Sequence, residues 1–316
     1  MQTIYPAKFV KLPKVEYRRE RWELDDGDFM DVDWVDNDDH SQPLVVMFHG
    51  LEGNSHSNYA LDLMAALKAR GWRGVVVHFR GCSGENNRLP RAYFAGDSAD
   101  IDMALSRIRK STPNTAVYAV GVSLGGNALL KWLGESGEHA GALIDAAAAI
   151  SAPMDLAATG HALDHGFNLM VYTPRFIETM RPKALEKARQ FPGLLDEEKI
   201  KSAHTIEEMD TYVTAKLHGF IDAEDYWAKN ASKPWLMSIT LPTLIVNARN
   251  DPFVPAESLP AETEVSASVT LEYPEAGGHV GFVTGPFPGH LDWLPQHLIE
   301  YFSSLGLRTP HSESAK

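Results

Sequence analysis

The stretch Gly121-Val122-Ser123-Leu124-Gly125 lies between an apolar, β-branched run at 116–120 and a helix-forming run at 127–133. A strand that turns sharply into a helix forces the residue at the turn into a strained backbone conformation. Glycines two positions before and two after that residue let the neighbouring chain pass without Cβ clashes. We therefore expect Ser123 to stand at the carboxyl end of a strand, with its hydroxyl exposed. The pattern alone also fits a chance pentapeptide in a tight turn.

Two later residues supply the partners that a serine nucleophile needs, namely a histidine base and a carboxylate. Asp251 follows the buried apolar run 243–248, in a turn before a proline, and His279 follows a second strand-like run, 269–273, on a glycine-rich loop. The chain order serine, aspartate, histidine is that of α/β-hydrolases. The sequence thus predicts catalytic roles for Ser123, Asp251 and His279. The alternatives are a turn-forming aspartate and a loop histidine that lacks a partner.

Acyl transfer also requires N–H donors for the oxyanion of its tetrahedral intermediate. One is expected from the backbone of Leu124, the residue after the nucleophile. The second is expected from Leu51, in the sequence His49-Gly50-Leu51-Glu52-Gly53 that follows the apolar run 44–48. The alternative interpretation is a glycine-rich connection that only turns the chain towards the next helix.

Other reactive side chains suggest weaker hypotheses. Cys82 has no base at a recognisable spacing, so a structural turn is favoured over a thiol nucleophile, with Arg80 anchoring neighbouring loops. His161 and His165 have the spacing of a two-histidine metal site, but the glutamate of His-Glu-x-x-His is absent. We expect no metal and no cofactor.

Composition limits the possible partners. The chain has 316 residues, 44% of them hydrophobic, with a net charge of -13 and one cysteine. An acidic chain repels phosphate backbones and anionic membrane surfaces, which disfavours nucleic-acid binding and leaves a small-molecule substrate as the expected partner. No run reaches the ~20 apolar residues of a membrane span, and residues 1–6 lack a leader pattern. One cysteine excludes an intrachain disulfide and fits a reducing compartment, so we expect a cytoplasmic location.

Apolar strand-like runs alternate with helical stretches from 44 to 150, the rhythm of a parallel α/β sheet, after an antiparallel hairpin at 21–35. No further strand-like run occurs before residue 243. These patterns predict an α/β core at 1–152 and 235–307, a helical cap insertion at 153–234 over the edge that carries Ser123, and a flexible tail at 308–316. The insertion's apolar residues are expected to form its own core or to line an acyl pocket: Phe167, Met170, Val171, Phe176, Ile177 and Met180.

Five stretches together resemble the YheT-type esterases, a branch of the α/β-hydrolase superfamily related to eukaryotic abhydrolase-domain lipases and esterases. They are His49-Gly50-Leu51-Glu52-Gly53, His78-Phe79-Arg80-Gly81-Cys82-Ser83-Gly84, Gly121-Val122-Ser123-Leu124-Gly125-Gly126-Asn127, Leu217-His218-Gly219-Phe220 and Gly277-Gly278-His279-Val280-Gly281-Phe282. The resemblance implies a mostly parallel sheet flanked by helices and cofactor-free, serine-dependent hydrolysis of carboxylic esters. It assigns the same triad roles to Ser123, Asp251 and His279.

The expected activity is that of an esterase for short to medium acyl chains, acting through an acyl-enzyme intermediate. A thioesterase, acyltransferase or amidase uses the same constellation with a different leaving group or acceptor. A binding protein without catalysis is a further alternative, although binding alone does not need all three groups. An aspartate nucleophile, as in haloalkane dehalogenases, is excluded by the serine at the turn.

Overall fold

A computed structural model describes residues 10–306 and contains one eight-stranded sheet in the order β1-β2-β4-β3-β5-β6-β7-β8. Strands β1 and β2 form an antiparallel hairpin and β2 pairs antiparallel with β4, whereas all later neighbours are parallel. The prediction of a mostly parallel α/β sheet is therefore confirmed. The strands are β1 Arg18–Glu23, β2 Phe29–Val35, β3 Leu44–Phe48, β4 Arg73–Val77, β5 Val117–Val122, β6 Ala146–Ile150, β7 Thr243–Val246 and β8 Val269–Glu272.

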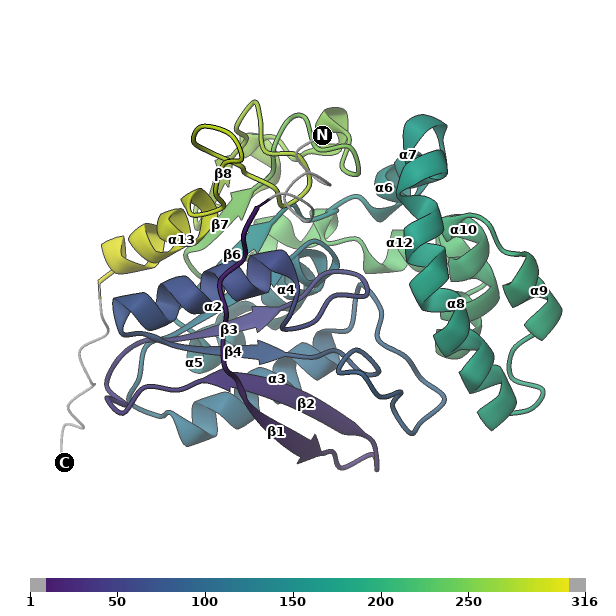
Figure 1. Cartoon of the computed structure of the whole chain (residues 1–316), viewed down its shortest axis with the longest axis horizontal. Coiled ribbons are helices and arrows are strands. Elements are labelled where there is room, and N and C mark those ends of the chain that lie inside the picture. The colour runs from purple at the N-terminus through teal and green to yellow at the C-terminus, as the bar shows by residue number, and fades with distance from the viewer. Residues whose placement is uncertain (1–9, 307–316) are drawn as a thin grey trace.

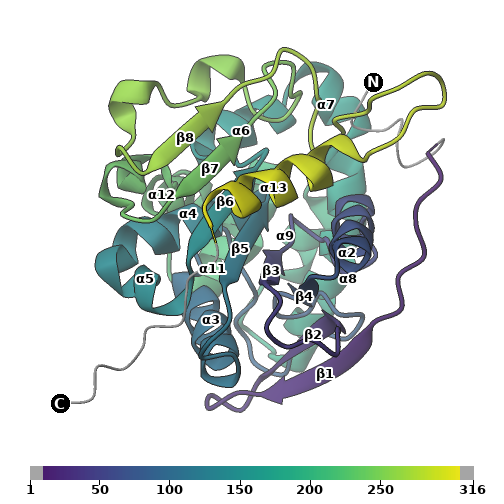
Figure 2. The same ribbon diagram turned by 90° about the vertical axis from the view of Figure 1, so that its left-hand side faces the viewer.

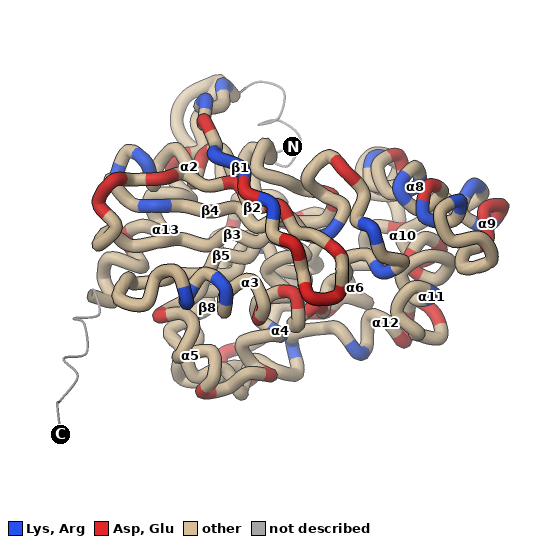
Figure 3. Tube along the Cα trace, turned by 90° about the horizontal axis from the view of Figure 1, so that it is seen from below, with Lys and Arg blue, Asp and Glu red and all other residues tan. Residues whose placement is uncertain are grey.

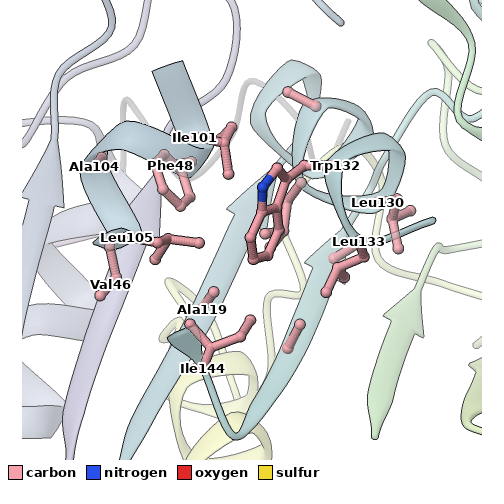
Figure 4. Packing of buried hydrophobic residues seen from close by; sticks show 14 of the residues in the cluster. Val46, Phe48, Ile101, Ala104, Leu105, Ala119, Leu130, Trp132, Leu133 and Ile144 are labelled. Carbon is pink, nitrogen blue, oxygen red and sulfur yellow. The ribbon is translucent and has the colours of Figure 1, made fainter. Parts of the chain in front are cut away.

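Helices cover both faces of this sheet, which explains why β3, β4, β5 and β6 consist of continuously buried residues. Helices α2 (Asn58–Arg70) and α13 (Trp293–Ser304) pack on one face, where Figure 2 shows them beside each other. Helices α3 (Ser98–Ser111), α4 (Leu124–Ser136) and α5 (Ala140–Leu143) pack on the other face. There Trp132 of α4 is almost completely buried, against aliphatic side chains from the sheet and α3 (Figure 4). These two clusters form the core that holds the strand ends in place.

The chain between β6 and β7 is helical and gathers at one end of the sheet, seen on the right of Figure 1. Its α-helices are α6 Leu156–Leu163, α7 Gly166–Val171, α8 Thr173–Gln190, α9 Glu197–Ser202, α10 Ile206–Met209, α11 Ala215–His218 and α12 Ala223–Asn230. A single π-helical turn, η2 (Asp210–Thr214), joins α10 to α11. This segment has its own apolar cluster, which also includes Phe253 from the loop after β7.

One expectation requires correction. The apolar pattern predicts that Phe167 and Met170 of α7 pack inside the helical segment, but they are 62% and 72% exposed. The reason is that α7 is only six residues long, so its apolar positions do not form a stripe that a neighbour covers. Ile177 is buried as expected, and Phe176 and Met180 line the cavity described below. Helix α13 was not predicted, and the predicted tail at 308–316 lies outside the described residues.

Charged residues are distributed without a single-sign stripe in the view of Figure 3, where acidic and basic positions alternate along the β1–β2 hairpin and α8. Several of these charges are paired across strands. Arg19 and Arg21 of β1 each make a two-pronged ion pair, with Asp33 and Asp31 of β2 respectively. The hairpin charges therefore stabilise its register and do not form a basic surface for an anionic polymer.

Candidate active site

Ser123 occupies the turn between β5 and α4 with φ 53° and ψ -121°, a conformation that L-residues rarely adopt. The glycines around it are required by close packing. A Cβ added at Gly121 would lie 2.5 Å from the carbonyl oxygen of Gly125. One added at Gly125 would lie 2.5 Å from the carbonyl oxygens of both Phe48 and His49. The sharp turn predicted from the pentapeptide is confirmed.

The structure brings the three predicted catalytic side chains together. Asp251 follows β7 and His279 follows β8, so both lie at the same sheet edge as Ser123. The His279 Nε2 atom lies 2.9 Å from Ser123 Oγ, and its Nδ1 atom lies 2.8 Å from Asp251 Oδ2. The other carboxylate oxygen of Asp251 accepts hydrogen bonds from the backbone N–H groups of Phe253 at 2.8 Å and Val254 at 3.3 Å. A carboxylate so held can fix the tautomer of a histidine that faces a hydroxyl.

The loop that carries His279 is held by two side chains that sequence reasoning missed. Asn250 Oδ1 accepts hydrogen bonds from the N–H groups of Gly277 and Gly278, at 2.9 and 2.8 Å. Ser151 Oγ accepts the N–H of Val280 at 3.1 Å, and Val280 has a φ of 60°, which is strained for a β-branched residue. Asn250 adjoins Asp251, so its place in that turn was a usable signal. Nothing in the sequence pairs Ser151 with a loop 129 residues later.

The predicted oxyanion donors, Leu51 and Leu124, line the same cavity as Ser123 and His279. Neither amide donates a hydrogen bond within residues 10–306. The carbonyl of Gly50 accepts hydrogen bonds from His49 Nδ1–H at 2.8 Å and from the Gly53 N–H at 2.9 Å. Because a trans peptide points its C=O and N–H in opposite directions, this also fixes the Leu51 N–H.

His49 carries the proton on Nδ1 because its Nε2 atom accepts the N–H of Phe79 at 3.0 Å. Burial lowers the pKa of His49 to about 3, so the ring is neutral at physiological pH and this tautomer persists. The role of Leu51 and Leu124 towards an oxyanion stays a prediction.

A cavity of about 1200 Å³, which includes the solvent at its mouth, adjoins Ser123 between the sheet edge and the helical segment. Most of its wall is apolar, with Leu156, Phe176, Met209 and Trp227 contributed by the helices. The ring of Phe253 lies 4.4 Å from that of His279, centroid to centroid, and shields it on one side. Such a site can hold an apolar group next to the serine while excluding much of the water.

The surroundings of Cys82 and Arg80 bear on the weaker hypotheses from the sequence. Cys82 is buried, and burial raises the pKa of its thiol to about 12, which disfavours the thiolate. Arg80 donates to Asp26, Asp28 and Asp100, and so anchors loops as expected.

His161 and His165 each have a hydrogen-bonding partner. The Nε2 atom of His161 pairs with Glu224, and His165 Nδ1 bonds to the His161 carbonyl. In the part of the chain that the structure describes, no cluster of three potential metal ligands occurs. Between residues 10 and 306, no helix has the length and apolar character needed to cross a membrane.

Comparison with known proteins agrees with the observed fold. Residues 43–286 match a family described as having the alpha/beta hydrolase fold. The chain is 37% identical to the Escherichia coli protein named "Putative esterase YheT", over 96% of this chain and 90% of that protein. It is 28% identical to human "Phospholipase ABHD3", over 96% of this chain and 76% of that protein.

Solved structures share the architecture at low sequence identity. An esterase from Pyrococcus furiosus superimposes with a TM-score of 0.59 at 16% identity, covering 94% of this chain and 98% of that one. Est1E from Butyrivibrio proteoclasticus gives a TM-score of 0.58 at 15% identity, covering 91% of this chain and 98% of that one. With its sheet order, its strand-to-helix serine turn and its sequence match over most of its length, the chain belongs to the α/β-hydrolase fold family.

Proposed function

We propose that this protein is a serine hydrolase that cleaves carboxylic esters through an acyl-enzyme intermediate. The observation that carries the proposal is the hydrogen-bonded series Ser123 Oγ, His279 and Asp251, with distances of 2.9 and 2.8 Å. Its place on the wall of an apolar cavity adds support, because an ester with an apolar acyl group can reach the hydroxyl there.

In this mechanism Ser123 Oγ attacks the ester carbonyl carbon while His279 Nε2 takes the hydroxyl proton. Asp251 accepts the hydrogen bond of Nδ1–H and stabilises the imidazolium that forms. The carbonyl oxygen becomes an oxyanion that accepts the N–H groups of Leu51 and Leu124. The tetrahedral intermediate then collapses, and His279 gives its proton to the leaving alkoxide. Water repeats the sequence on the acyl-enzyme and releases the acid.

The substrates we propose are esters with short to medium acyl chains. Relatives named esterase, phospholipase and monoacylglycerol lipase support esters as the substrate class, whereas the chain length rests on the Met- and aromatic-rich helical segment that lines the cavity. We further propose that the segment 153–234 acts as a cap, since its helices supply much of the wall of the cavity that Ser123 also lines. A cytoplasmic location stays a prediction from the sequence.

The test combines covalent labelling with an acyl-chain series. A fluorophosphonate probe should label the wild-type protein and leave Ser123→Ala unlabelled. The same variant should lose hydrolysis of p-nitrophenyl esters by several powers of ten, because no other hydroxyl replaces the nucleophile. Turnover that is retained in Ser123→Ala contradicts the proposed mechanism, and a preference for long emulsified esters contradicts the proposed chain length.

A further inference from the structure

The loop expected to bind the oxyanion carries a charged side chain directly after Leu51. Glu52 has a φ of 56°, which is uncommon for a residue other than glycine. Its backbone N–H donates to the Tyr93 hydroxyl oxygen at 2.8 Å, and the same hydroxyl lies 2.9 Å from Glu52 Oε1. The carboxylate is therefore held beside the loop instead of extending into solvent, and its side chain is only 8% exposed.

The partner of this carboxylate comes from the helical segment. Lys183, in the middle of α8, places its Nζ atom 2.8 Å from Glu52 Oε2. The ion pair joins the loop after β3 to a helix far along the chain, and both residues line the cavity that contains Ser123. Lys187, the next lysine along this face of α8, cannot take over, because its ammonium donates to the backbone carbonyls of Leu89 and Asn87.

The charge of Glu52 bears directly on the proposed reaction. An oxyanion forming at the Leu51 N–H develops negative charge in the cavity that Glu52 also lines, and two like charges in a partly dry cavity repel each other. A cation in contact with the carboxylate cancels that repulsion.

We propose that Lys183 is a positioning residue for ester hydrolysis, which neutralises the Glu52 carboxylate beside the expected oxyanion site. This inference rests on the proposed function of Ser123 and extends it by giving a residue of the helical segment a part in the chemical step. Because the effect arises when the oxyanion forms, it acts on kcat and not on substrate binding.

The experiment compares Lys183→Met, Lys183→Arg and the double variant Glu52→Gln/Lys183→Met with wild type. Lys183→Met is expected to lower kcat for a p-nitrophenyl ester about tenfold with little change in KM, a fraction of the ~10²–10³-fold loss typical when an oxyanion donor is removed. Lys183→Arg keeps the charge and is expected to recover most of this loss. The double variant should recover too, since the amide that replaces the Glu52 carboxylate keeps contact with Tyr93 and carries no charge.

A matched control is Lys229→Met, which removes an ion pair with Asp225 inside α12 and is expected to leave kcat unchanged. Full kcat in Lys183→Met overturns the inference, as does a double variant that is as slow as Lys183→Met. A raised KM with unchanged kcat also overturns it, because that pattern belongs to substrate binding. Turnover that survives Ser123→Ala overturns the proposed function together with this inference, whereas Ser123-dependent turnover at full kcat in Lys183→Met overturns this inference alone.

Discussion

Asp251→Asn is the substitution for which the structure predicts the most specific failure. The Oδ1 atom of Asp251 accepts two backbone N–H groups, from Phe253 and Val254, while Oδ2 faces His279 Nδ1. An asparagine has one oxygen and one NH₂ group, and its oxygen must take the place of Oδ1 to satisfy the two backbone donors. The NH₂ group is then directed at His279 Nδ1.

This orientation reverses the tautomer of the imidazole. An NH₂ donor requires Nδ1 of His279 to accept, so the ring proton moves to Nε2, where it points at Ser123 Oγ. A protonated Nε2 cannot remove the hydroxyl proton. The equivalent substitution in a serine protease triad lowers kcat about 10⁴-fold, equal to ~5.5 kcal/mol of transition-state stabilisation at about 1.4 kcal/mol per factor of ten. We expect a loss of the same order here.

The assay is steady-state hydrolysis of a p-nitrophenyl ester, together with the free energy of unfolding from chemical denaturation. The variant should retain its stability to within about 1 kcal/mol, because both backbone hydrogen bonds persist. Asp251→Ala serves as the comparison, since it removes the carboxylate and also leaves two backbone donors without their acceptor. A folded Asp251→Asn variant that retains more than about a tenth of wild-type kcat would refute the tautomer argument.

Three further predictions test other parts of the structure. Gly125→Ala should lower the free energy of unfolding by about 2–3 kcal/mol and also lower kcat, because the added Cβ lies 2.5 Å from the His49 carbonyl oxygen; unchanged denaturation and kinetics would contradict the close packing. Burial raises the pKa of Asp210 from 3.8 to about 6, so the folded state loses stability as pH rises from about 4 to 6. Asp210→Asn, which can still accept from Trp227, should escape this loss and gain up to about 3 kcal/mol over wild type between about pH 4 and pH 7 in denaturation experiments; a constant difference would contradict the prediction. The thiol of Cys82, with its pKa raised by burial to about 12, should react with iodoacetamide at about pH 8 roughly 10³-fold more slowly in the native than in the unfolded chain, and equal rates would show that it is accessible.

Local sequence signals predicted the parts of the site that follow strand ends. Ser123, Asp251 and His279 each come shortly after the end of a strand-like run, and parallel strands bring their carboxyl ends to one edge. Their convergence therefore follows from topology, which the alternation of strands and helices already indicates. The same logic placed Leu51 and Leu124 beside the serine.

Local sequence patterns could not predict contacts between segments that lie far apart along the chain. The pairing of Glu52 with Lys183 depends on how α8 packs over the sheet edge, and no periodicity in the sequence encodes that orientation. Hydrophobicity alone also failed at Phe167 and Met170, since whether an apolar residue of a short helix is covered depends on its neighbours in space. Sequence patterns thus specify the sheet edge well and the helical segment above it poorly.

Residues with unfavourable backbone conformations also cluster at the sheet edge that carries Ser123. All five non-glycine residues with positive φ in the described range follow strands of the parallel part of the sheet: Glu52, Ser123, Ser151, Val280 and Phe282. Hydrogen bonds hold each of them, including Ser123 N–H to the Ile150 carbonyl and Ser151 N–H to the Val246 carbonyl, both at 2.8 Å. Strained residues persist only where the surrounding structure over-determines them. The densely packed sheet therefore does more than position the strand ends, because it also stabilises the unfavourable backbone conformations through which the serine and its partners approach one another.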